Sequence, residues 1–168
     1  MVRKLSLSAM IAALYAALTI ALAPISFGPV QFRVAEALTL LPFFMPEAIP
    51  GLFIGCMIAN FTGGFGIIDI VFGSSATLIA AWLTYEMPSI WLAAIPPVIV
   101  NAIVVGGYLA FITETPLALS ILYIGASEAV ICFGLGIPLC KLIASRTRIF
   151  DSVINSKKKK PKWLVIKR

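Results

Sequence analysis

Long apolar segments alternate with short stretches that contain polar residues, glycine or proline over most of the chain. Several of these segments reach the about 20 residues that a helix needs to cross the hydrocarbon layer of a membrane. The region 5–145 has room for about five to seven such helices joined by short loops. We predict six helices, over residues 8–23, 34–44, 48–61, 70–84, 89–112 and 117–145.

Residues that begin, end or bend helices mark the breaks between the segments. Ser8 is the expected cap of the first helix, and Pro24 ends it. The segment 34–44 is short for a membrane span, which implies a tilted helix or one shielded by its neighbours. Pro96 and Pro97 predict a kink within the fifth helix.

The composition and the placement of charge strengthen this interpretation. Of the residues, 61% are hydrophobic and only 12% are charged, which is outside the range of soluble domains. Arg33 is the only basic residue between Leu5 and Cys140, and the other basic residues lie near the two ends of the chain. Positive charge next to membrane spans stays in the cytoplasm, so both termini are expected there and the number of spans is even.

The sequence therefore predicts an all-α, multi-pass protein of the cell membrane. We expect residues 1–147 to form a six-helix transmembrane domain and residues 148–168 to form a basic cytoplasmic tail. The basic residues lie beside apolar segments, a placement that favours contact with the lipid bilayer over binding of nucleic acid.

Several kinds of chemistry are disfavoured by the residues that the chain lacks or scatters. There is no histidine, which excludes imidazole-based catalysis and metal binding, and Cys56, Cys132 and Cys140 lie apart in apolar segments. The sequence also has no phosphate-binding loop for ATP. We expect neither enzymatic activity nor a metal or cofactor, and any energy for transport must come from a partner or a gradient.

Polar side chains inside membrane segments are costly, and they are therefore the candidates for function. On the six-helix topology they gather towards the outer half of the bundle, where they can line one cavity open to the outside, as a polar and roughly planar ligand requires. These residues are Gln31, Arg33, Glu36, Asn60, Asp69, Asn101 and Glu128.

Structural roles for some of these residues remain open at this point. Arg33 and Glu36 are three residues apart and can neutralise one another. Asp69 can cap the start of the fourth helix, and Asn60 can cap the end of the third. Glu128 is harder to explain in this way, because a buried carboxylate needs a partner and helices 3 to 6 contain no basic residue apart from Lys141, near the end of the last helix.

A face of small residues follows the first helix. Ala9, Ala13, Ala17 and Ala21 recur every four residues, and such faces let helices approach closely in lipid. This face either packs against other helices of the chain or docks another subunit.

The stretch from Phe27 to Leu38, followed by Leu41 and Pro42, resembles the QueT group of S components from energy-coupling factor transporters. The resemblance extends over most of the membrane region and leaves out the lysine-rich tail. It also includes residues 55–60, 69–73, 97–101, Glu128 and 136–139.

This resemblance implies a six-helix S component that captures a queuosine precursor, a 7-deazaguanine or queuine, from outside. It also implies association with a membrane T protein, which Ala9, Ala13 and Ala17 would contact, and with two ABC ATPase subunits.

A deazapurine base has a ring N–H and an exocyclic amine along one edge, and a carboxylate can accept from both. Glu128 or Glu36 is the candidate for that edge, while Asn60 and Asn101 would bind other edges. Asp69 would face a cationic aminomethyl substituent.

An aromatic side chain, Phe32 or Tyr123, would stack on the ring of the ligand. The first outer loop, which carries Phe32, is the natural lid over the site.

Other functions remain as alternatives. The chain can be an S component for another micronutrient, or a secondary transporter of a small polar heterocycle in which Glu128 and Asp69 carry protons. The lack of a visible internal repeat weakens the second alternative. An intramembrane enzyme is disfavoured by the absence of a metal-type carboxylate cluster, and a membrane scaffold would not explain the gathering of polar residues.

Overall fold

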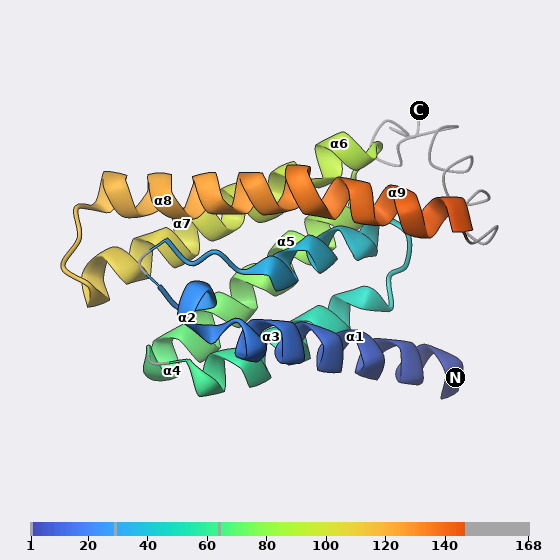
Figure 1. Ribbon diagram of the computed structural model, residues 1–168, viewed down its shortest axis with the longest axis horizontal. Coiled ribbons are helices and arrows are strands. Elements are labelled where there is room, and N and C mark those ends of the chain that lie inside the picture. Colours follow the sequence, from blue (N-terminus) through green and yellow to red (C-terminus); the bar gives the residue numbers. More distant parts are fainter. Residues whose placement is uncertain (1, 29, 64, 147–168) are drawn as a thin grey trace, which may run out of the picture.

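The computed structural model describes residues 2–28, 30–63 and 65–146, and within these residues the chain is helical with short connecting turns and no strand. The predicted tail, residues 148–168, lies outside the described residues. Figure 1 shows an elongated bundle in which the start of the first helix and the end of the last helix lie at the same end.

The first helix, α1 (Val2–Ala21), starts earlier than the predicted position at Ser8. The hydroxyl of Ser8 does not cap it and instead donates to the backbone oxygen of Glu47, at 2.7 Å. Lys4 forms an ion pair with the carboxylate of Glu47, at 3.0 Å. These contacts attach the first turns of α1 to Glu47, the residue directly before the third helix, α3 (Ala48–Thr62). A short helix, α2 (Ala23–Ser26), follows α1.

The second predicted helix forms over Val34–Phe43 as η1, a 3₁₀-helix. All its residues from Ala35 to Phe43 are buried, as expected for a helix that is apolar all round. A 3₁₀-helix rises about 2.0 Å per residue, so this segment extends about 20 Å where an α-helix of the same length would extend about 15 Å. The short helix is therefore both stretched and shielded by its neighbours.

The third helix, α3 (Ala48–Thr62), agrees with the prediction within a residue. The fourth is longer than predicted, because α4 (Gly66–Ile68), η2 (Asp69–Gly73) and α5 (Ser74–Glu86) continue one another. Of these, η2 is a π-helical turn. Such turns widen the helix locally and are frequent at functional sites.

The fifth helix is interrupted at Ala94, just before the proline pair at which the sequence predicts a kink. The segment is divided into α6 (Ile90–Ala93) and α7 (Ile95–Ile112), so both prolines lie in the first turn of α7. A backbone N–H has no partner within the helix at that position, and proline is tolerated there without a kink. The last segment runs through α8 (Leu117–Ala129), the π-helical η3 (Val130–Gly136) and α9 (Ile137–Arg146).

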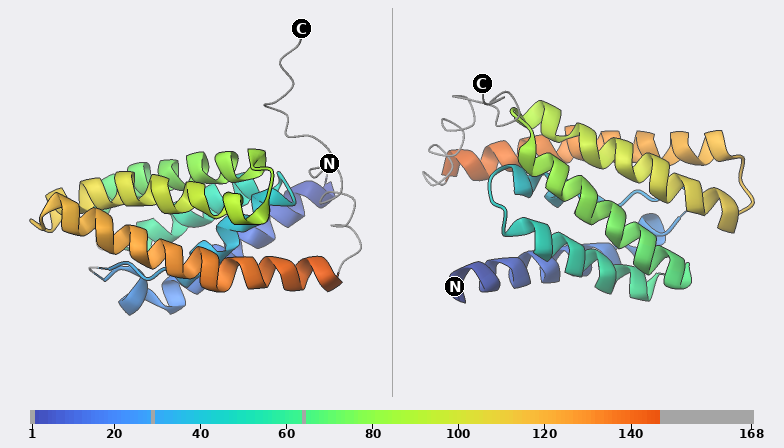
Figure 2. Two further views of the ribbon diagram at one scale, coloured as in Figure 1. Left: turned by 90° about the horizontal axis from the view of Figure 1, so that it is seen from above. Right: turned by 180° about the vertical axis from the view of Figure 1, so that it is seen from behind.

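The helices pack as two outer pairs with buried segments between them. The contacts between α1 and α3 and between α7 and α8 are the most extensive, and Figures 1 and 2 show these pairs on opposite sides of η1 and α5. η1 also packs against η3, α5 and α1.

Two glycines of α3 let α1 approach closely. A Cβ atom at Gly51 would lie 2.6 Å from the backbone oxygen of Ser8, and one at Gly55 would lie 2.7 Å from that of Ala12. Close backbone contact of this kind is typical of helix pairs in membranes.

Four helical stretches of the described chain are long and apolar enough to cross a membrane, and two further apolar helices, η1 and α3, are shorter. The four long stretches are Val2–Ala21, Gly66–Glu86, Ile90–Ile112 and Leu117–Ser145.

Candidate functional site

Arg33 lies at the junction of the first loop and η1, where its side chain is buried. It forms an ion pair with Asp69, at 3.5 Å between the guanidinium and the carboxylate. Its Nε donates to the backbone oxygen of Ser26 at 3.4 Å, and the ring of Phe27 lies 5.3 Å from the guanidinium carbon. The neutralising partner of Arg33 is therefore Asp69, and the alternative of a pair with Glu36 is wrong.

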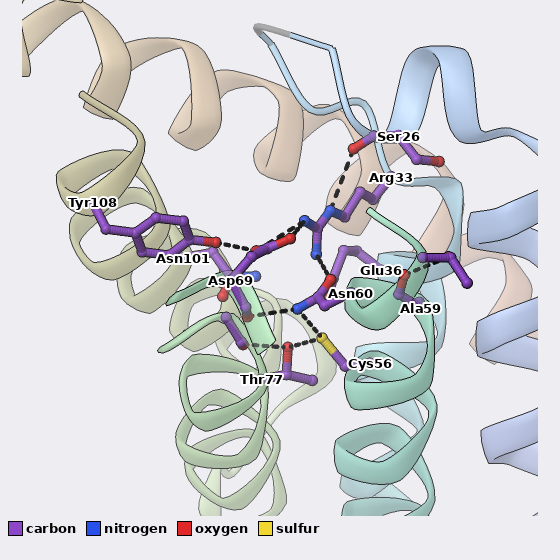
Figure 3. A network of polar contacts seen from close by, with 12 residues as sticks. Ser26, Arg33, Glu36, Cys56, Ala59, Asn60, Asp69, Thr77, Asn101 and Tyr108 are labelled. Carbon is purple, nitrogen blue, oxygen red and sulfur yellow. Dashed lines mark hydrogen bonds and ion pairs between the residues drawn. The ribbon is translucent and has the colours of Figure 1, made fainter. Parts of the chain in front are cut away.

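Asn60 and Tyr108 complete the surroundings of this ion pair. Arg33 donates to the side-chain oxygen of Asn60 at 3.0 Å, and the Asn60 amide donates to the backbone oxygen of Asp69 at 2.9 Å. The hydroxyl of Tyr108, on α7, donates to the Asp69 carboxylate. Figure 3 shows Arg33 between Asp69 and Asn60, with Tyr108 reaching Asp69 from another side.

This network replaces the capping roles that the sequence left open. The capping residue that precedes η2 is Ile68, which makes no side-chain capping hydrogen bond, and the capping residue that follows α3 is Gly63. Asp69 and Asn60 are instead fully buried and hydrogen-bonded across three segments. Their carboxylate and amide hold Arg33, and with it the end of the first loop, against α3 and η2.

Gly73, at the end of η2, makes room for the network. A Cβ atom there would lie 2.8 Å from the Asn60 amide nitrogen, 2.9 Å from a carboxylate oxygen of Asp69 and 3.2 Å from the Tyr108 hydroxyl. The glycine is therefore required by the close approach of three polar side chains.

The other two buried carboxylates lie nearby and have different partners. Glu36, 2% exposed, accepts a hydrogen bond from the hydroxyl of Tyr15, which is fully buried on α1. Glu128, on α8, accepts from the amide of Asn101, on α7, and from the Cys132 thiol at 3.7 Å. Among the described residues neither carboxylate has an ion-pair partner.

These carboxylates share a small polar cavity of about 10 Å³ in the bundle, which is room for about one water molecule. It is lined by Gln31, Arg33, Glu36, Gly73, Thr77, Asn101, Val105, Ile124 and Glu128. Three buried polar atoms of the lining residues have no hydrogen-bond partner among the described residues: Gln31 Nε2, Glu36 Oε2 and Asn101 Oδ1. Unpaired buried polar atoms are rare, and here they can serve a ligand that supplies the missing donors and acceptor.

Gln31 enters the cavity from the first loop in an unusual backbone conformation. Its φ of 47° is in the left-handed region, which costs a non-glycine residue about 1–2 kcal/mol. Its backbone oxygen accepts from the Ser127 hydroxyl at 3.5 Å, and its N–H donates to the backbone oxygen of Gly28 at 3.0 Å. Strain of this kind persists where the surroundings fix it, often at binding sites.

The structure brings most of the sequence-predicted residues together. Gln31, Arg33, Glu36, Asn101 and Glu128 line the cavity, while Asn60 and Asp69 form the adjoining network.

The two aromatic candidates lie elsewhere. Phe32 is half-buried and does not line the cavity. Tyr123 is 39% exposed and borders a second cavity of about 60 Å³, towards the loop between α7 and α8.

Sequence reasoning missed several residues of the site. Tyr15 and Tyr108 each donate to one of the buried carboxylates, and Thr77 borders the cavity while donating to Cys56 at 3.3 Å. A tyrosine within an apolar helix is the available signal, because a buried phenol needs a hydrogen-bond partner. Among the described residues, no group of acidic residues and cysteines is arranged to hold a metal ion.

The small residues of α1 face two ways. Ala12 and Ala16 are buried, and the contact of Ala12 with Gly55 places this side of the helix against α3. Ala9, Ala13 and Ala17 are exposed.

Comparison with known proteins gives one family and one relative. The model of the QueT transporter family matches residues 5–145. A protein of Lactococcus lactis subsp. cremoris (strain MG1363), described as "Queuosine precursor transporter QueT", is 45% identical over 73 residues, which are 42% of this chain and 43% of that protein. The aligned region thus spans less than half the length of the relative. No solved structure matches the chain. With its long apolar helices and a family match over nearly the whole helical region, the chain is a multi-pass membrane protein that belongs to the QueT transporter family.

Proposed function

We propose that this protein is the substrate-binding S component of an energy-coupling factor importer and that it binds a queuosine precursor, a 7-deazaguanine or queuine. The observation that carries the proposal is the cavity in the apolar bundle, with its unpaired atoms on Gln31, Glu36 and Asn101. The family assignment and the name of the Lactococcus relative supply the class of ligand.

The chemistry of the cavity suits a planar, nitrogen-rich base. The Glu128 carboxylate is oriented by Asn101 and can accept from the ring N–H and the exocyclic amine of a deazaguanine. The free amide N–H of Gln31 is a donor for the ring carbonyl. Val105 and Ile124 provide the apolar walls of the cavity.

The cavity is too small for a base as it stands in this structure. Its volume of about 10 Å³ is room for about one water molecule, whereas small-molecule pockets measure about 300–1,000 Å³. A base that enters it therefore displaces side chains, and Gln31 and Arg33 are the lining residues that come from the first loop and not from a helix.

For the membrane topology we propose six spans with both termini in the cytoplasm. The six helical stretches of the described chain and the position of both helical ends at one end of the bundle support this arrangement (Figure 1). A cysteine that replaces Glu114 should react with an impermeant thiol reagent from outside the cell, and one that replaces Ser145 only after permeabilisation. The reverse pattern contradicts the proposal.

The partners are proposed to be a membrane T protein and two ABC ATPases. The exposed alanines of α1, Ala9, Ala13 and Ala17, offer a face where another helix can approach closely in lipid. Bulky replacements such as Ala13→Trp should abolish uptake and complex formation while the isolated chain still binds its ligand. Normal uptake by that variant refutes this face as the partner site.

Two measurements separate this proposal from a proton-coupled carrier. Calorimetric titration of the purified chain with deazaguanines should give binding in the absence of any partner, and Glu128→Gln should weaken it by about 10- to 100-fold through loss of a charge-assisted acceptor. Proteoliposomes with this chain alone should not accumulate ligand. Flat titrations refute the substrate, and ATP-independent accumulation refutes the S component.

A further inference from the structure

The charges around the cavity do not balance. Arg33, Glu36 and Glu128 line it, and the guanidinium of Arg33 is bound to the carboxylate of Asp69 and the amide oxygen of Asn60. The single cation of the site is thus neutralised outside the cavity. Two carboxylates then face the cavity without a cation of their own among the described residues.

The two carboxylates differ in how far they are already satisfied. Both oxygens of Glu128 accept hydrogen bonds, from Asn101 and from the Cys132 thiol. Glu36 accepts only from Tyr15, through Oε1, while its Oε2 is buried and has no partner. The bond from α1 therefore fixes the orientation of Glu36 and leaves one oxygen for the cavity.

From this arrangement we propose that the site selects a ligand that carries a protonated amine, and that Glu36 is the residue that pairs with the ammonium group. The inference rests on the proposed function and deepens it by assigning the charge of the ligand. A buried carboxylate is tolerated when an opposite charge and hydrogen bonds accompany it, and a cationic ligand supplies both.

Two features of the surroundings favour this assignment. Asp69, the residue that the sequence suggested for a cationic substituent, is occupied by Arg33 and Tyr108 and does not line the cavity. The second unpaired acceptor of the cavity, Asn101 Oδ1, can also accept a hydrogen bond from a donor on the ligand. A neutral ligand with an acceptor in place of the amine would leave Glu36 uncompensated, so the site discriminates against it.

The test compares two probes that share one ring system, aminomethyl-deazaguanine, which is a cation at neutral pH, and cyano-deazaguanine, which is neutral. We expect the purified full chain to bind the aminomethyl compound about 10- to 100-fold more tightly than the cyano compound, because a charge-assisted hydrogen bond in a buried site contributes that much to affinity. Glu36→Gln should abolish this preference and change the affinity for the cyano compound less than about threefold. Glu47→Gln removes a carboxylate paired with Lys4, away from the cavity, and should leave both affinities unchanged.

Tyr15→Phe keeps the carboxylate but removes the group that orients it, and it gives a second result where Glu36→Gln does not fold. It should weaken binding of the aminomethyl compound selectively, by about 3- to 10-fold. Equal affinity of the unaltered chain for the two compounds, or an equal loss for both in the Glu36 variant, overturns the inference and leaves the proposed function standing. Flat titrations with both compounds overturn the proposed function and the inference with it.

Discussion

The fit of Gly73 among Asn60, Asp69 and Tyr108 leads to the sharpest prediction about the buried network. In Gly73→Ala the new methyl group would lie 2.8 Å from the Asn60 amide nitrogen and 2.9 Å from the Asp69 carboxylate. These neighbours are buried side chains tied to Arg33, so the methyl group can be accommodated only by breaking or lengthening their hydrogen bonds.

The magnitude follows from two contributions. Overpacking of a well-packed interior costs about 1–3 kcal/mol. A buried polar group that loses its partner costs about 1–3 kcal/mol more. The free energy of unfolding should therefore fall by about 2–6 kcal/mol when one bond of the network is lost. Ligand affinity should fall as well, because Arg33 lines the cavity.

A matched control exists on α7. A Cβ atom at Gly107 would have no described atom within 4 Å apart from its chain neighbours and the backbone of its own helix. Gly107→Ala should therefore raise the free energy of unfolding, by no more than about 1 kcal/mol. Thermal unfolding of both purified variants in detergent, with and without ligand, measures the difference. Equal melting temperatures for Gly73→Ala and Gly107→Ala would refute the described packing.

Two further predictions concern α1 and its contacts. Gly55→Ala places a methyl group 2.7 Å from the backbone oxygen of Ala12 and 2.9 Å from the Cβ of Tyr15. It should therefore separate α1 from α3, lower the melting temperature and weaken ligand binding through Tyr15. An unchanged melting temperature and affinity would show that the two helices are less closely packed. The pKa of Glu47 is lowered by a hydrogen bond from its own backbone N–H and by Lys4. The charged Glu47 therefore stabilises the folded protein, by at most about 1 kcal/mol. This stabilisation is present above the unfolded pKa of about 4.3 and is lost as the pH falls through the lower pKa of the folded state. The melting temperature of Glu47→Gln should thus lie below that of the unaltered chain at pH 7 and meet it in acid, and a gap that persists in acid contradicts this role.

The positions of the helices could be predicted from the sequence because hydropathy alone determines them. The apolar segments and their glycine and proline breaks correspond to the observed helices, with differences mainly at the ends. The 3₁₀ form of η1 and the π-helical turns could not be predicted, because they depend on the packing of neighbouring helices. The same holds for the start of α1, where Ser8 contacts the segment that begins at Glu47.

The site could be predicted only as a set of residues. The cost of burying Glu36, Asp69 and Glu128 in an apolar bundle identified them. Their partners depend on geometry, and the alternative pair of Arg33 with Glu36 does not form because the spacing rule applies inside helices. Arg33 precedes η1 in an extended conformation, so its side chain reaches Asp69 instead.

The most direct test of the account is an experimental structure of the chain with aminomethyl-deazaguanine bound. We predict that the base lies between η1, α7 and α8, with its N–H edge at Glu128 and its ammonium group at Glu36. A ligand found in the cavity beside Tyr123, or on the surface of the bundle, would contradict the central claim that these buried carboxylates form the binding site.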